Sequence, residues 1–258
     1  MIWEKLKEWM GGGEDGNGEF QPEWITLLEK NLPLYKRLPD EMRQHLHERI
    51  ARFVESVRFE GCNGLDVTDD MILTVAAQAC LLVIHRDGVP YPGLRTVYLY
   101  PSTFSSIHKS VDAMGVVTEG RVHRLGESWE TGTIILSWDS VEQGARDIRD
   151  GSNVTFHEFA HQLDHEDGPT DGAPGLASRA AYRSWARVFS ESYADFQELT
   201  ERGRKTVMDA YGATSPAEFF AVATETFFEK PRQLSGKQPE LYEELVGYYG
   251  LDPREWLP

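Results

Sequence analysis

The spacing of hydrophobic residues divides the chain into a helical first part, a short β-rich middle and a helical last part. Residues 40–57 repeat apolar side chains at intervals of three and four, which predicts an amphipathic helix that begins at Asp40. Thr68 is a typical N-cap for a further helix that runs to about residue 84. The β-branched and aromatic segments predicted as strands are 96–100, 116–125 and 133–138, with a polar, glycine-marked loop at 126–132.

The last part of the chain returns to helical spacing. The predicted helices are 154–165, 178–201, 216–229 and 239–248. Helices, then a small mixed sheet, then helices again predict an α+β fold. The length fits a single domain over residues 21–258, preceded at residues 1–20 by a short helix and a flexible, glycine-rich linker.

Composition and charge narrow the class of protein. With 40% hydrophobic residues the chain can build a core, but its apolar runs are far shorter than the ~20 residues of a membrane helix. The N-terminus lacks the apolar stretch of a signal peptide, so we expect a cytoplasmic protein. The net charge of −16 repels nucleic acid and leaves a basic partner possible. Two cysteines outside any C-x-x-C pair are expected to be reduced and structural.

One short segment carries recognisable chemistry. His157, Glu158 and His161 form the pattern H-E-x-x-H within the predicted helix 154–165. Residues four positions apart share one helix face, so both imidazoles can bind a single zinc ion. Glu158 lies about 100° around the helix, where it can accept a proton from a metal-activated water without binding the metal itself.

A catalytic zinc site needs a third protein ligand, and the spacing leaves three candidates. Asp167 occupies the last position of an extended H-E-x-x-H-x-x-G-x-x-H pattern, although Asp164 replaces its glycine. Glu218 lies in the first turn of a later helix, where it can equally form a capping box with Ser215. Glu225 lies seven residues further along the same face of this helix. Its alternatives are a metal ligand, a hydrogen-bond partner of a ligand, or a surface residue. Asp164 is also a candidate acceptor for the second ring nitrogen of a ligand histidine.

Longer motifs resemble those of a known family. The strings HEFAHQLD and DAYGATSPAEFFAVATETFFEKP are similar to the Mlc titration factor A family of zinc metallopeptidases. The same family is matched, in the same order, by RFEGCNGLDVTDDM, AAQACLLVI, YPGLRTVYLYPSTF and LSWDSVEQGARD. The resemblance covers roughly residues 23–253. Because the family is distantly similar to the peptidase domain of anthrax lethal factor, it implies a zincin-like fold.

The resemblance implies a role for each site residue. His157 and His161 match the two histidine ligands of one zinc ion, and Glu218 matches the glutamate ligand. Glu158 matches the general base. Tyr211 alone would be interpreted as a turn aromatic that covers the core, but it matches a tyrosine that stabilises the tetrahedral intermediate. The family therefore implies a gluzincin-type hydrolase with aminopeptidase-like action on short peptides.

Two further expectations follow from the resemblance. The family is known for binding and sequestering a glucose-responsive transcriptional repressor, so the alternative function is regulatory binding with peptidase activity secondary. In a zincin architecture, an extended substrate pairs with an edge strand above the metal helix. Residues 133–138 are predicted to be that strand.

Overall fold

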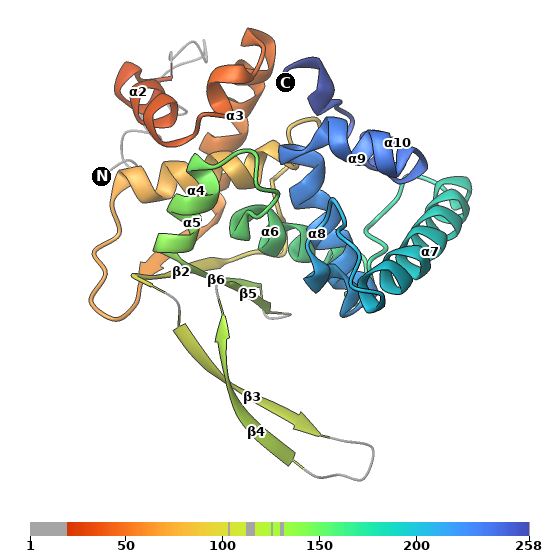
Figure 1. Cartoon of the computed structure of the whole chain (residues 1–258). Helices are drawn as coiled ribbons and strands as arrows, with labels where there is room; N and C mark the ends of the chain where they lie inside the picture. The colour runs from red at the N-terminus through yellow and green to blue at the C-terminus, as the bar shows by residue number, and fades with distance from the viewer. Residues whose placement is uncertain (1–19, 103, 112–116, 125, 130–131, 258) are drawn as a thin grey trace.

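The computed structural model describes residues 20–102, 104–111, 117–124, 126–129 and 132–257 (Figure 1). Apart from residue 20, the helix and linker predicted at residues 1–20 lie outside the described residues. In the described part, helices flank a small mixed sheet, and the predicted α+β class is confirmed. None of the described helices combines the length and apolar character needed to cross a membrane.

The first part of the chain is helical around one short strand. Its elements are α2 (Pro22–Asn31), η1 (Tyr35–Arg37), α3 (Asp40–Ser56), β1 (Arg58–Gly61) and α4 (Asp69–Leu81). The helix predicted to begin at Asp40 is confirmed as α3. The Thr68 side chain accepts a hydrogen bond from the backbone N–H of Met71, so the predicted cap of α4 is confirmed as well.

The middle of the chain forms two small sheets. Its strands are β2 (Thr96–Tyr100), β3 (Phe104–Val111), β4 (Val117–Arg124), β5 (Gly126–Trp129) and β6 (Thr133–Ser137). The main sheet has the order β1-β2-β6-β5, in which β1, β2 and β6 are parallel and β5 is antiparallel to β6. β3 and β4 pair with each other in an antiparallel hairpin that extends away from the main sheet (Figure 1).

Two predictions about this region are wrong. Residues 126–132 were expected to form a loop, but 126–129 are strand β5, which pairs with β6 in the register Ser128↔Ile134. β5 gains its hydrogen bonds from a neighbouring strand, and its own four residues carry no alternating pattern that would reveal it. Residues 133–138 were expected to be an edge strand, but β6 (Thr133–Ser137) lies between β2 and β5. The edge on this side of the sheet is therefore β5.

The last part of the chain is helical. Its elements are α5 (Trp138–Arg146), α6 (Val154–His165), α7 (Arg179–Glu201), η2 (Ala210–Ala213), α8 (Pro216–Glu229), α9 (Pro231–Lys237), α10 (Pro239–Tyr249) and η3 (Pro253–Glu255). The helices predicted at 154–165 and 216–229 are confirmed as α6 and α8. Those predicted at 178–201 and 239–248 are confirmed to within one residue as α7 and α10.

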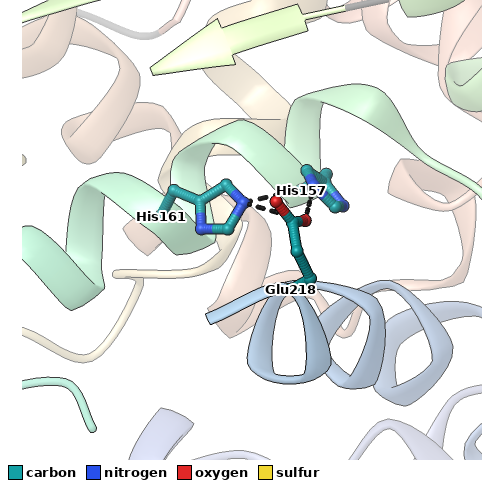
Figure 2. Close-up of side chains that lie close together, drawn as sticks. All are labelled: His157, His161 and Glu218. Carbon is teal, nitrogen blue, oxygen red and sulfur yellow. Dashed lines mark hydrogen bonds and ion pairs between the residues drawn. The ribbon is translucent and has the colours of Figure 1, made fainter. Parts of the chain in front are cut away.

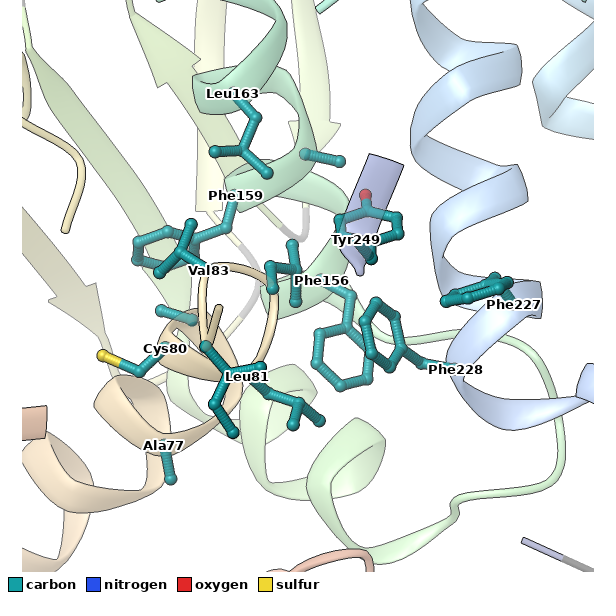
Figure 3. Packing of buried hydrophobic residues seen from close by; sticks show 14 of the residues in the cluster. Ala77, Cys80, Leu81, Val83, Phe156, Phe159, Leu163, Phe227, Phe228 and Tyr249 are labelled. Atoms are coloured by element: carbon teal, nitrogen blue, oxygen red, sulfur yellow. The ribbon is translucent and has the colours of Figure 1, made fainter. Parts of the chain in front are cut away.

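The core surrounds α6 and fixes its position. Figure 3 shows Phe156, Phe159 and Leu163 projecting from α6 among buried side chains of neighbouring elements. The ring of Phe156 stacks on Phe228 of α8 with centroids 5.0 Å apart, and Phe159 packs edge-on against Tyr91 at 4.9 Å. Because these aromatic contacts hold α6 on more than one side, the polar residues on its remaining face have a well-defined place.

Candidate metal centre

Asn153 fixes where α6 begins. Its side-chain oxygen accepts hydrogen bonds from the backbone N–H groups of Thr155 and Phe156, both at 3.1 Å. Its amide nitrogen donates to Gln78 on α4 and to Glu229 on α8. A cap that is also bonded to two other helices holds the first turn of α6 in place, and the histidine face of the helix begins in that turn.

Glu218 is presented by the first turn of α8. The Ser215 hydroxyl accepts a hydrogen bond from the Glu218 N–H at 3.2 Å, which forms half of the predicted capping box. The carboxylate of Glu218 lies against the imidazoles of His157 and His161, as Figure 2 shows. The structure therefore favours a role at the histidines for this carboxylate over a purely local cap.

The side-chain atoms of these three residues converge on one point. Glu218 Oε2 lies 3.0 Å from His157 Nε2 and 3.3 Å from His161 Nε2, and the two nitrogens are 3.2 Å apart. Atoms bound at 2.0–2.1 Å to one tetrahedral ion are separated by about 3.3 Å. The three atoms thus already have the spacing that a small divalent metal ion requires. Two imidazole nitrogens and one carboxylate oxygen are also a suitable donor set.

The other two candidates for the third ligand lie elsewhere. Asp167 lies in the loop after α6, where it accepts a hydrogen bond from the hydroxyl of Tyr182 on α7. The structure therefore does not bring Asp167 to the histidines. Glu225 is beside His157, but on the far side of its ring, where its carboxylate accepts a hydrogen bond from Nδ1 at 2.8 Å. Its other oxygen accepts from the backbone N–H of Asn153. Glu225 therefore orients an imidazole and does not join the converging atoms.

The charges at the centre favour a cation. Burial alone would lower the pKa of His157, but hydrogen bonds to the carboxylates of Glu218 and Glu225 raise it well above its ordinary value. Burial likewise raises the pKa of Glu218, and the hydrogen bonds from the two histidines lower it by more, to well below its usual range. The carboxylates of Glu218 and Glu225 therefore make the surroundings of His157 favourable to positive charge.

Glu158 and Tyr211 border the same point. Glu158 is buried, with 5% of its surface exposed, and its charge contributes to the raised pKa of His157. The Tyr211 hydroxyl donates to Glu218 Oε1 at 3.3 Å, and its ring lies 6.0 Å from that of His157. With 53% of its surface exposed, Tyr211 lies at the solvent side of the centre and is not a core residue.

Asp164 does not act as the acceptor for a ligand histidine. Its Oδ2 accepts a hydrogen bond from the backbone N–H of Gly172 at 2.8 Å. Within the described residues, His161 Nδ1 is buried without a hydrogen-bond partner. The interaction considered for Asp164 is instead made by Glu225 on the other histidine, His157, and sequence spacing offered no means of choosing between them.

Comparison with known proteins gives a family match over most of the chain. The model of a family described as glucose-regulated metallo-peptidase M90 matches residues 7–250. The uncharacterized protein slr2042 of Synechocystis sp. is 42% identical over 233 residues, which are 90% of this chain and 85% of the relative. Mlc titration factor A of Yersinia pestis and that of Yersinia pseudotuberculosis are each 31% identical over 249 residues, 95% of this chain and 90% of the relative.

Proposed function

Because this chain belongs to the family of glucose-regulated metallo-peptidases M90, we propose that it is a zinc-dependent peptidase with aminopeptidase-like action on short peptides. The family match confirms the resemblance to the Mlc titration factor A metallopeptidases that the motifs indicated. The observation that supports a metal-dependent reaction is the convergence of the side-chain atoms of His157, His161 and Glu218 to separations of 3.0–3.3 Å.

Zinc is the metal that this donor set favours. His157, His161 and Glu218 would hold one ion per chain through two nitrogens and one oxygen, whereas magnesium and calcium prefer oxygen ligands alone. When bound, zinc supplies Lewis-acid chemistry, which polarises the scissile carbonyl group and makes water a stronger acid.

Glu158 would act as the general base. It follows His157 directly on α6, its charge acts on His157, and it is not one of the three converging groups. In the proposed reaction Glu158 accepts a proton from the attacking water and delivers it to the leaving amine. Its burial raises the strength of each electrostatic interaction it makes there, since little water competes.

Tyr211 would stabilise charge that develops on the substrate. A phenol hydroxyl within hydrogen-bond reach of the reacting carbonyl oxygen favours the tetrahedral intermediate, by about 2–4 kcal/mol for a well-placed donor. Its contact with Glu218 Oε1 and its exposure support a position at the mouth of the centre. A substrate that displaces this weak contact would gain the Tyr211 hydrogen bond.

An extended substrate would pair with β5. This strand is bonded to β6 on one side, and no strand in the described part of the chain pairs with its other side. β5 also packs beside α6, which carries the histidines. Free backbone groups along an edge strand can bind a peptide by strand addition, so β5 takes the substrate-binding role first expected of residues 133–138.

The decisive experiment measures zinc and hydrolysis together. Purified protein and the variant Glu218→Ala are analysed for metal content and tested on a panel of aminoacyl substrates and internally quenched peptides. We expect one zinc per chain, weaker binding in the variant, and chelator-sensitive cleavage that favours the aminoacyl substrates. Absence of zinc after gentle purification and zinc resupply would contradict the proposed centre.

Regulatory binding is the second candidate function. Relatives of this chain are named Mlc titration factor A, and the net charge of −16 suits a partner with basic surfaces, such as a DNA-binding repressor that responds to glucose. In this proposal the protein is cytoplasmic, residues 21–258 form one domain, and the protein sequesters the repressor. Capture of a purified repressor that survives Glu158→Gln, but is lost when surface acids are neutralised, would support it. Capture lost in Glu158→Gln would tie it to catalysis.

A further inference from the structure

Gly172 lies in the loop between α6 and α7 and is bonded to both helices. Its N–H donates to Asp164 Oδ2, in the last turn of α6, at 2.8 Å. Its carbonyl oxygen accepts a hydrogen bond from Trp185 Nε1, on α7, at 2.9 Å. Gly172, Asp164 and Trp185 are all buried. The backbone of this residue is therefore held on two sides.

On its third side Gly172 touches the helix that carries Glu218. The backbone of Gly172 has φ +85°, and a Cβ added there would lie 2.5 Å from the carbonyl oxygen of Pro216 and 2.8 Å from its carbonyl carbon. Pro216 is the first residue of α8, two positions before Glu218. Only a glycine allows the loop to approach the first turn of α8 this closely.

We propose that Gly172 is a positioning residue for Glu218, which sets the separation between the end of α6 and the first turn of α8. The inference rests on the proposed function, since it concerns the same metal centre. Asp164, which lies three residues after His161 on α6, accepts the hydrogen bond from the Gly172 N–H. One buried chain of contacts therefore links the two helices that supply the converging atoms. In this proposal the buried carboxylate of Asp164 holds Gly172 in place and does not orient a histidine.

A methyl group at position 172 cannot be accommodated by a side-chain rotation, because the atoms it meets belong to the backbone. Either the loop moves away and loses its hydrogen bonds to Asp164 and Trp185, or the first turn of α8 moves away with Glu218. The second movement changes the distances of 3.0 and 3.3 Å between Glu218 Oε2 and the histidine nitrogens directly, and the first removes the loop contact that the proposal assigns to holding α8 at this separation. Weaker metal binding is the expected consequence.

The test compares zinc affinity in two glycine variants, measured by competition with a chromophoric chelator. Gly172→Ala is expected to bind zinc about 10–100-fold more weakly than the parent protein. Gly88→Ala is the matched control, because Gly88 has φ +82° and an added Cβ there meets nothing within 4 Å. It carries the same backbone strain without the collision, so its affinity should stay within about twofold. Equal affinities in the two variants would overturn the proposal.

A double-variant cycle shows whether Gly172 acts through Glu218. Adding Gly172→Ala to Glu218→Ala should cost no further zinc affinity, because the moved side chain is already absent. The same loss in both backgrounds would overturn the role proposed for Gly172. A parent protein that binds no zinc, or a Glu218→Ala variant that binds it as tightly as the parent, would contradict the proposed function instead.

A second variant decides the case in which circular dichroism shows Gly172→Ala to be unfolded. Trp185→Phe removes the hydrogen bond to the Gly172 carbonyl and keeps an aromatic ring to stack on Phe189, whose centroid lies 3.9 Å away. Zinc affinity several-fold below that of the parent is expected. An unchanged affinity would overturn the proposal.

Discussion

Glu225 Oε1 lies 2.8 Å from His157 Nδ1, on the side of the ring opposite Glu218. An ionised carboxylate only accepts hydrogen bonds, so Nδ1 carries the proton and Nε2 is the nitrogen that faces the candidate metal centre. The other oxygen of Glu225 accepts from the N–H of Asn153, the cap of α6. One buried carboxylate thus couples the start of the helix to the orientation of a ligand.

Removal of this carboxylate should weaken metal binding. We expect Glu225→Ala to lower zinc affinity by about 10–100-fold, because the ring of His157 is no longer held in one orientation and tautomer. Glu225→Gln, whose amide oxygen can still accept from Nδ1, should restore part of the loss. Chelator competition at fixed pH measures both variants.

Glu229→Ala is the matched control for this experiment. Glu229 is buried one helical turn further along α8, and its two carboxylate oxygens accept hydrogen bonds from the Asn153 side chain and the Gly151 N–H, not from His157. Its loss should reduce the stability to urea and leave zinc affinity within about threefold. If both variants lost affinity equally, the effect would come from the cap at Asn153, and the role assigned to the Glu225 contact would be wrong.

Glu158→Gln should separate metal binding from hydrolysis. Gln has nearly the same shape as Glu but cannot accept the proton, so we expect unchanged zinc content and peptide turnover reduced by about 10²–10⁴-fold. Metal analysis and initial rates on the cleaved peptide provide the measurement. Turnover at the parental rate with zinc bound would exclude Glu158 as the base.

The sequence predicted features that depend on neighbouring residues. The start of α6 at Asn153 followed from a local cap and hydrophobic spacing, and the structure has the same boundaries. The pairing of His157 with His161 followed from helix geometry alone. Thr68 at the start of α4 is a third example, because its hydroxyl bonds within the next turn. These features depend on a few consecutive residues, so they can be predicted without knowledge of the tertiary structure.

Features that depend on tertiary packing were beyond the sequence. Strand β5 exists because β6 lies beside it, and the four residues of β5 resemble a loop. Glu218 and Glu225 share one face of α8 at a spacing of seven, so spacing could not tell which approaches the histidines from the metal side. The angle at which α8 crosses α6 decides this, and it is set by contacts such as Phe156 with Phe228. The role of Asp164 depends on a loop whose course the sequence does not indicate.

Tyr211→Phe should affect the rate more than binding. The hydroxyl group is expected to stabilise the transition state by about 2–4 kcal/mol, so kcat should fall by about 30–1000-fold while KM and zinc affinity change little. The residue is half-exposed, and its loss should not disturb the core. Steady-state kinetics with zinc in excess measures the effect.

Tyr182→Phe provides the comparison for Tyr211. Tyr182 is also partly exposed, but its hydroxyl bonds to Asp167 in the loop after α6 and not to Glu218. The kcat of the Tyr182→Phe variant should equal that of the parent protein. An equal loss in the two variants would indicate a general effect of removing a surface hydroxyl, and a parental rate in Tyr211→Phe would remove Tyr211 from the mechanism.

His47 should make the protein less stable in mild acid, independently of the metal centre. Burial, with a smaller contribution from the charge of Arg43, lowers the pKa of His47 from 6.5 to about 4. Its ring stacks on Phe20 with centroids 4.0 Å apart, and Nε2 lies 2.8 Å from the Tyr35 hydroxyl. The neutral ring is therefore the form that fits the folded protein.

The direction of the pH effect follows from the lowered pKa. Between pH 6.5 and about 4 the unfolded chain binds a proton at His47 that the folded protein does not, so the stabilisation is complete above pH 6.5 and is lost as the pH falls through this window. Allowing for partial exposure, the loss is on the order of 2 kcal/mol. Urea unfolding with chelator present, at pH 7.5 and pH 4.5, should show the parent losing about 2 kcal/mol more than His47→Gln, whose side chain does not titrate. Parallel losses in the two proteins would mean that His47 is protonated as readily in the folded state as in the unfolded chain.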